Sequence, residues 1–190
     1  MNKTTIIFLR HGEVHNKKQI LYARLPGFKL SKNGIVQIQD ATRQLISEDI
    51  SHIYTSPMLR ARQTASIISR RLKIKPQTSK FLNEVKLLFS GMLLSEYKKN
   101  IQPRLYDDEF IKKGQERVGE ISHRMLKFVD MICKKHPSQT ILAVSHGDPI
   151  TILRAKISHK DFTWNYKKDN YLQTGHWLKL KCMDQTYRWT

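Results

Sequence analysis

The chain has 190 residues, enough for one domain with a full hydrophobic core, and its 34 lysines and arginines against 16 acidic residues give a net charge of +18. This charge favours phosphorylated or otherwise anionic partners. The apolar runs are too short to span a bilayer, no secretory signal is visible, and Cys133 and Cys182 lack the spacing of a disulfide framework or a structural zinc site. We therefore expect a single cytoplasmic domain over residues 1–190.

The first predicted element is a strand over residues 6–9, whose four large apolar residues are typical of a strand buried on both faces. It ends in Arg10 and His11, and in open α/β sheets ligands collect at the carboxyl ends of the strands. Residues 13–29 predict a loop over the sheet edge. A helix then begins after Ser31, its expected N-cap, and continues to about Ile46.

The next strand is predicted over residues 52–55. Ser56 and Pro57 follow as the expected N-cap and first residue of a helix that continues to Leu72 and carries Arg60 in its first turn. Residues 74–78 predict a further strand, at an edge because it contains proline.

Residues 85–114 show little periodicity and predict an irregular insertion with short helices that covers the substrate. An amphipathic helix is expected over 115–136 and a strand over 140–144, which ends in Ser145-His146-Gly147. Asp148 and Pro149 predict the start of a helix that ends near Ile157. The last strand is expected over 171–180, antiparallel at an edge. The alternation predicts an α/β fold: a three-layer α/β/α sandwich with a mostly parallel sheet and an antiparallel edge strand.

Three strand ends should thus bring charged side chains to one side of the sheet. Free N–H groups at helix starts, together with arginines, favour a phosphoryl group there. The remaining histidines show no such context, and we expect ordinary structural roles for His15, His52, His123, His136, His159 and His176. The basic residues form scattered pairs on solvated surface, and only Lys17-Lys18 is placed to rim the site.

The chain carries three motifs in a fixed order: Arg10-His11-Gly12-Glu13 with Asn16, the stretch SPMLRARQTA at residues 56–65, and Ser145-His146-Gly147. Together they resemble the histidine phosphatase superfamily, the phosphoglycerate-mutase-like enzymes, and within it the phosphatase branch. The resemblance implies that His11 is a nucleophile that becomes phosphohistidine. It implies that the phosphoryl oxygens are bound by Arg10, Asn16, Arg60, His146 and Gly147. It implies no metal and no cofactor.

A general acid must also protonate the leaving group. By resemblance this is Glu84, although residues 85–91 depart from the family pattern. Asp148 is the alternative acid, but its position before Pro149 favours helix capping. Glu13 is expected to orient the loop.

The function expected from these features is a phosphatase acting on a phosphorylated small molecule, less readily on a phosphoprotein, with specificity residing in residues 85–114. One alternative is phosphoryl transfer of the phosphoglycerate-mutase type, for which the chain has little room. The other is a basic nucleic-acid-binding or phosphoprotein-binding protein with a vestigial site. No dense basic tract or nucleic-acid module supports it.

Overall fold

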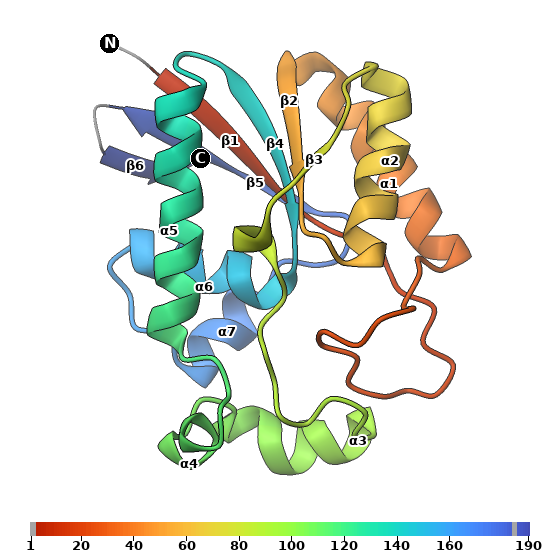
Figure 1. Ribbon diagram of the computed structural model, residues 1–190, viewed down its shortest axis with the longest axis vertical. Helices are drawn as coiled ribbons and strands as arrows, with labels where there is room; N and C mark the ends of the chain where they lie inside the picture. The colour runs from red at the N-terminus through yellow and green to blue at the C-terminus, as the bar shows by residue number, and fades with distance from the viewer. Residues whose placement is uncertain (1–2, 184–185) are drawn as a thin grey trace.

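The computed structural model describes residues 3–183 and 186–190 and shows a mixed sheet in the order β3-β2-β4-β1-β5-β6 (Figure 1). β1, β2, β3 and β4 pair in parallel, whereas β5 and β6 are antiparallel. This confirms the predicted fold class. The strands are β1 Lys3–Arg10, β2 Ile50–Thr55, β3 Gln77–Thr78, β4 Thr140–Ser145, β5 Trp177–Met183 and β6 Thr186–Trp189.

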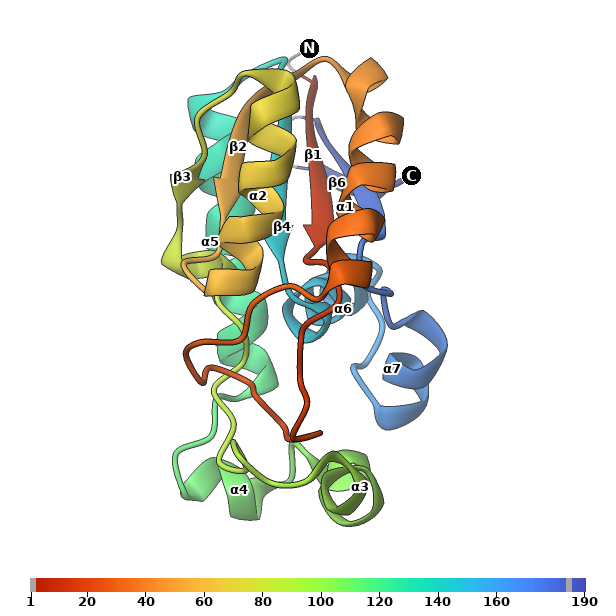
Figure 2. The ribbon, with the colours of Figure 1, turned by 90° about the vertical axis from the view of Figure 1, so that its right-hand side faces the viewer.

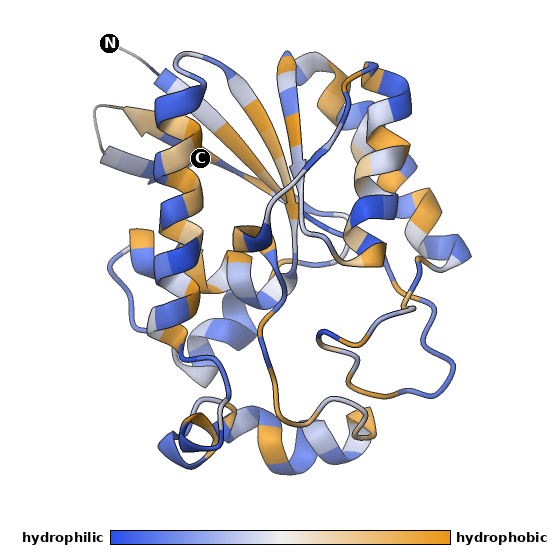
Figure 3. Ribbon diagram, in the orientation of Figure 1, coloured by the Kyte–Doolittle hydropathy of each residue, from blue (hydrophilic) through white to orange (hydrophobic). Residues whose placement is uncertain are grey.

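β1 and β4 lie in the middle of the sheet because their side chains are apolar on both faces. Ile6 and Phe8 pack into one hydrophobic cluster, with α5 and α6, and Ile7 and Leu9 pack into another, with α1 and α2. All four are fully buried. The hydrophobic residues accordingly gather on the central strands and on the helix sides facing them (Figure 3).

Helices cover both faces of the sheet, which gives the three layers (Figures 1 and 2). One face carries α1 Lys32–Leu45 and α2 Leu59–Leu72, and the other α5 Val118–Lys135 and α6 Gly147–Ile157. Ser31 caps α1 as predicted, since its hydroxyl accepts a hydrogen bond from the Gly34 N–H at 2.9 Å. None of the helices in the described part of the chain is long and apolar enough to cross a membrane.

Two predicted helix starts were wrong. α2 begins at Leu59 rather than Pro57, with Met58 as its N-cap. The Ser56 hydroxyl accepts from the Met58 N–H at 3.3 Å and lies 2.8 Å from His146 Nε2. α6 begins at Gly147, with no side chain capping it. Asp148 lies inside the first turn, where its carboxylate pairs with Lys167 rather than with the helix N–H groups.

The C-terminal prediction also needs correction. Residues 164–170 form α7 (Trp164–Asn170), and the last predicted strand begins only at Trp177. β5 lies inside the sheet between β1 and β6, so the antiparallel edge is β6, which the sequence did not predict. The opposite edge is the short β3, which begins directly after Pro76, and the edge position agrees with the prediction from that proline.

Residues 83–114 lie below the carboxyl ends of the parallel strands, and we call them the covering segment (Figure 2). One short bridge, between Ile20 and Leu93, joins this segment to the loop that follows β1. The shorter helical elements of the chain are η1 Ile46–Glu48, η2 Lys80–Leu82, α3 Leu94–Glu96, the π-helix η3 Tyr97–Ile101, η4 Gln102–Arg104 and α4 Asp108–Lys112. Cys133 on α5 and Cys182 on β5 are free and pack in the same hydrophobic cluster.

Candidate active site

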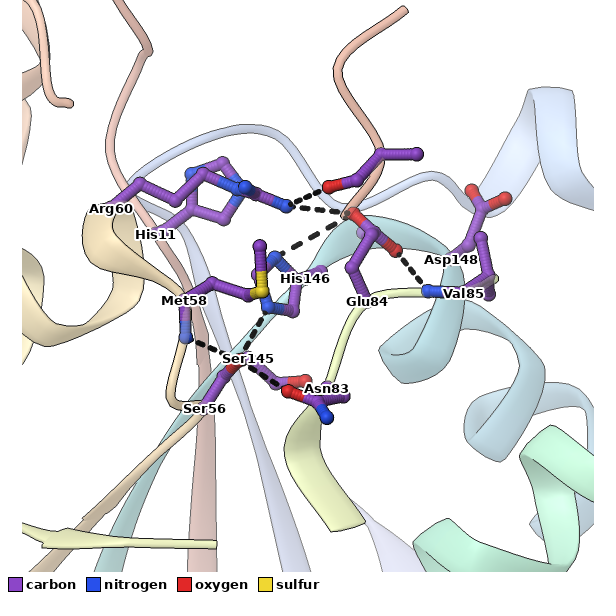
Figure 4. Close-up of polar contacts among 12 residues, drawn as sticks. His11, Ser56, Met58, Arg60, Asn83, Glu84, Val85, Ser145, His146 and Asp148 are labelled. Atoms are coloured by element: carbon purple, nitrogen blue, oxygen red, sulfur yellow. Dashed lines mark hydrogen bonds and ion pairs between the residues drawn. The ribbon is translucent and has the colours of Figure 1, made fainter. Parts of the chain in front are cut away.

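Two parallel strands bring the histidines together. β1 and β4 pair with Arg10 opposite Ser145, so His11 and His146 leave the sheet side by side. Their ring centroids are 5.1 Å apart, His11 is 1% exposed and His146 is fully buried. With Arg10, Arg60 and Glu84 they form a group that we call the His11 cluster (Figure 4 shows all of it except Arg10).

The contacts of His11 assign its tautomer. Nδ1 lies 2.8 Å from the Gly12 carbonyl, which can only accept, so Nδ1 carries the proton and Nε2 carries the lone pair. Arg60 Nε donates to Nε2 at 3.1 Å. Burial first, then the charges of Arg60 and Arg10, hold the pKa of His11 well below its usual value. His11 is therefore neutral at physiological pH, with a nucleophilic nitrogen facing the arginine.

Arg60 is fully buried and comes from the first turn of α2. Its Nη2 donates to the Ala23 carbonyl at 2.9 Å, and its guanidinium lies 4.8 Å from the ring centroid of Tyr22. These contacts orient the guanidinium toward His11.

Arg10 is held from the other side of the site. Nη1 donates to the Leu172 carbonyl at 2.7 Å, and the guanidinium lies 4.7 Å from the Tyr171 ring centroid. Arg10 Nε and His146 Nδ1 are buried and have no hydrogen-bond partner among the described residues. Buried polar atoms of this kind normally have partners, and phosphoryl oxygens would supply acceptors for both.

Glu84 follows η2 and points into the same cluster, with a side chain that is 13% exposed (Figure 4). Its Oε2 lies 3.6 Å from both Arg60 Nη2 and His146 Nδ1, and Oε1 accepts from the Val85 N–H at 2.9 Å. Burial raises the pKa of Glu84 above its usual value, although Arg60 opposes the change. A carboxyl with a raised pKa is suited to proton transfer near neutral pH.

A second carboxylate, Glu116, ties down the segment that carries Glu84. It accepts from Arg24 Nη2 at 2.9 Å and from Arg124 Nε at 2.6 Å. The two arginines each donate to one backbone carbonyl of the segment at 2.6 Å, Arg24 to that of Glu84 and Arg124 to that of Phe81. The position of Glu84 therefore depends on Glu116.

Asp148 forms its contacts outside the His11 cluster. Both its oxygens lie 2.8 Å from Lys167 Nζ, and Oδ2 accepts from Tyr106 Oη at 3.2 Å. The structure thus brings Glu84, rather than Asp148, against His11 and Arg60.

The other predicted site residues occupy different places. The Asn16 amide bonds to the backbone N–H and carbonyl of Ile20 at 3.2 and 2.8 Å, so it stabilises its own loop. Gly147 lies against Tyr171, whose ring would be 2.5 Å from an added Cβ. Lys17 and Lys18 are exposed. Glu13 accepts from Ser31 and Asn33 and thereby orients the loop, as predicted.

A cavity of about 240 Å³ extends from Arg10 and Glu84 under the covering segment. Part of its wall comes from residues 85–114, which the sequence analysis placed over the substrate without singling out residues: Leu87, Leu94, Tyr97, Lys98 and Gln102. Sequence reasoning missed Leu21, Tyr22, Lys167 and Tyr171, because neither periodicity nor motif spacing marks these positions.

The cluster also has a set of atoms that could ligate a metal. Nitrogen or oxygen atoms of His11, Glu84 and His146 all lie within 4.8 Å of one another. However, Arg60 Nε lies 3.1 Å from His11 Nε2, and a second guanidinium lines the cavity. This charge distribution favours an anion over a cation.

Comparisons with known proteins identify the family of the chain. The sequence matches the family described as the histidine phosphatase superfamily (branch 1) over residues 6–188. It is 32% identical to an uncharacterized protein of Mycobacterium tuberculosis, over 83% of this chain and 80% of that protein. It is 25% identical to phosphoserine phosphatase 1 of Hydrogenobacter thermophilus, over 87% of this chain and 82% of that protein.

Solved structures show the same fold. Bacillus stearothermophilus YhfR superposes with a TM-score of 0.84 at 22% identity, covering 98% of this chain and 95% of its own. The phosphoserine phosphatase of Entamoeba histolytica gives 0.81 at 21% identity with the same coverage, 98% and 95%. The match over nearly the whole chain shows that this protein belongs to branch 1 of the histidine phosphatase superfamily.

Proposed function

We propose that this protein is a phosphatase that hydrolyses a phosphomonoester through a phosphohistidine on His11. The observation that carries the proposal is the neutral His11 Nε2, held 3.1 Å from the buried Arg60 in a cluster that also contains Arg10, His146 and Glu84. A nucleophile, donors for phosphoryl oxygens and an acid are the groups that such a reaction needs.

In the first step the His11 Nε2 lone pair attacks phosphorus and the ester P–O bond breaks. Glu84 gives its proton to the leaving alkoxide. In the second step Glu84, now a carboxylate, takes a proton from water, which attacks phosphorus as the P–N bond breaks. Inorganic phosphate leaves, and His11 and Glu84 return to their starting states.

Arg10, Arg60 and His146 bind the phosphoryl oxygens during both steps. Preorganised donors of this kind are each worth about 2.7–4 kcal/mol of transition-state stabilisation in well-studied sites. Glu84 is better placed than Asp148 to act as the acid, because Glu84 lies in the His11 cluster, whereas both Asp148 oxygens lie 2.8 Å from Lys167 Nζ.

Hydrolysis is favoured over mutase-type transfer because water can reach the cluster. The cavity that is lined by Glu84 is also lined by Lys98, which is exposed. The second candidate, phosphoglycerate-mutase-type transfer, predicts exchange of phosphate between phosphoglycerate isomers in place of phosphate release.

The proposal is tested by comparing His11→Ala with His15→Ala, a control on an exposed histidine of the same loop. We expect His11→Ala to abolish turnover of p-nitrophenyl phosphate with an unchanged circular dichroism spectrum, and His15→Ala to retain turnover. A phosphometabolite panel then identifies the substrate. It includes phosphoserine, because one relative is named for it. Undiminished activity of His11→Ala would contradict the mechanism.

A further inference from the structure

The cavity beside the His11 cluster has an unusual wall residue, Lys167 of α7. Its side chain is buried, with the whole residue 6% exposed, and it lines the same cavity as Arg10 and Glu84. Lysine is almost never buried to this extent unless it is paired, and Nζ lies 2.8 Å from both oxygens of Asp148. Such a pair adds little to stability, so its place in a cavity wall points to binding.

The pair has hydrogen-bonding capacity left over. An ammonium group has three N–H donors, and Lys167 donates one of them to Asp148 Oδ2. Asp148 Oδ1 lies 2.8 Å from Nζ but is buried and has no hydrogen-bond partner among the described residues. Each carboxylate oxygen can accept more than one bond, and Tyr106 uses one further position. N–H donors of Lys167 and the adjacent Asp148 Oδ1 therefore remain for a ligand. A hydroxyl group matches both, since it accepts from Lys167 and donates to Asp148, whereas a carboxylate would be repelled by Asp148.

The rest of the cavity lining is largely aromatic and apolar. It contains Tyr22, Tyr97 and Tyr171 together with leucines 21, 87 and 94, and the Tyr171 ring centroid lies 5.3 Å from Lys167 Nζ. A cavity lined by aromatic rings and by a charged hydrogen-bonding pair suits a ligand with both C–H faces and hydroxyls, which describes a sugar or polyol. The volume of about 240 Å³ is below the range of drug-sized sites and is suited to a single ring.

Charge in the cavity argues against a second phosphate. Beyond Arg10, the only buried cation of the described wall is Lys167, which Asp148 neutralises, and Lys98 is exposed at the mouth. A bisphosphate would bring two more negative charges to a region without a matching buried cation.

We propose that Lys167, together with Asp148, binds a hydroxyl of the leaving group, so that the substrates are monophosphates of a single sugar or polyol. The inference rests on the proposed phosphatase function. Lys167 is a specificity-determining residue that acts on the leaving group, while the His11 cluster acts on the phosphoryl group.

The test compares two esters of the same size, glucose 6-phosphate and cyclohexylmethyl phosphate, which has the ring without its hydroxyls. We expect the native protein to prefer the sugar ester. Lys167→Met should lower the ratio of the two kcat/KM values roughly ten- to hundred-fold, the range expected for a lost hydrogen bond to a charged group. Lys168→Met, the exposed neighbour on α7, should leave the ratio unchanged.

Two further measurements test the proposal if Lys167→Met folds poorly or if the native protein hydrolyses neither ester. Lys167→Met leaves Asp148 as an unpaired buried charge and could fold poorly for that reason. The double variant Asp148→Asn/Lys167→Met removes this charge, and we expect it to show the same loss in the ratio of the two kcat/KM values. Calorimetric binding of glucose 6-phosphate to His11→Ala, with and without Lys167→Met, reports the subsite even if the native protein turns over no ester. The proposal is overturned if Lys167→Met changes both esters equally, or if the native protein prefers cyclohexylmethyl phosphate or fructose 1,6-bisphosphate.

Discussion

At the scale of single residues, protonation states decide what the His11 cluster can do. Burial lowers the pKa values of His11 and His146 well below 6.5 and raises that of Glu84 above 4.5. The histidines therefore stay neutral into the acid range, and Glu84 keeps its proton to a higher pH than an exposed glutamate. The two arginines remain the cations of the site.

These shifts give a pH prediction. The kcat for alkyl phosphates should fall at acid pH only well below 6.5, where His11 becomes protonated, and should also fall at higher pH, where Glu84 ionises.

Glu84→Gln should remove the fall at higher pH and lower kcat for alkyl esters by about 10²–10⁴. Its effect on p-nitrophenyl phosphate should be much smaller when phosphorylation is followed in a single turnover, because nitrophenolate leaves without a proton. Equal losses for the two esters would show that Glu84 is not the acid.

At the scale of elements, the site depends on irregular segments held by specific contacts. The segment of Glu84 has two backbone carbonyls fixed by arginines, and both arginines pair with Glu116. We expect Glu116→Gln to lower the free energy of unfolding by about 1.5–3 kcal/mol and to slow turnover of alkyl esters.

Glu109 provides the matched control for Glu116. It also pairs with two cations, Arg104 and Lys113, but it is exposed. Glu109→Gln should leave both the free energy of unfolding and turnover nearly unchanged. Urea denaturation of both variants measures the difference, and equal effects would show that Glu116 has no special role.

The start of α1 gives a second prediction at this scale. An added Cβ at Gly34 would lie 2.1 Å from the Glu13 carbonyl oxygen, whereas one at Gly119, near the start of α5, would meet nothing within 4 Å. Gly34→Ala should destabilise the protein by about 1–3 kcal/mol, and Gly119→Ala should stabilise it by up to about 1 kcal/mol. Urea denaturation of the two variants checks this, and the same sign for both would contradict the close approach.

The sequence could predict the elements that follow from local patterns, but not the features that depend on long-range contacts. Strands β1 and β4 and the residues at their ends follow from continuous apolar runs, so the neighbourhood of His11 and His146 was predictable. The contact of Ser56 with His146 across the sheet was not, because long-range contacts leave no local pattern. The role of Lys167 was hidden for the same reason, since its partner Asp148 lies on another helix.

At the scale of the whole molecule, the chain carries a net charge of +18, and the substrate that we propose is an anion. Such a field attracts a phosphate ester from a distance, and salt screens it. The kcat/KM for a dianionic ester should therefore fall as ionic strength rises, with kcat nearly constant. A flat kcat/KM would show that the charge does not steer the substrate. Steeply salt-dependent binding of nucleic acid without ester turnover would instead favour the binding-protein alternative.

The central claim is that His11 carries the phosphoryl group, and trapping the intermediate tests it most directly. Glu84→Gln should accumulate phosphoenzyme from p-nitrophenyl phosphate, because the leaving group needs no acid while water lacks its base. After an alkaline quench and digestion, mass spectrometry should find one phosphoryl group on the peptide containing His11, lost on acid treatment, and none in the double variant with His11→Ala. A phosphoryl group on another residue, or none while nitrophenolate is released, would contradict the account.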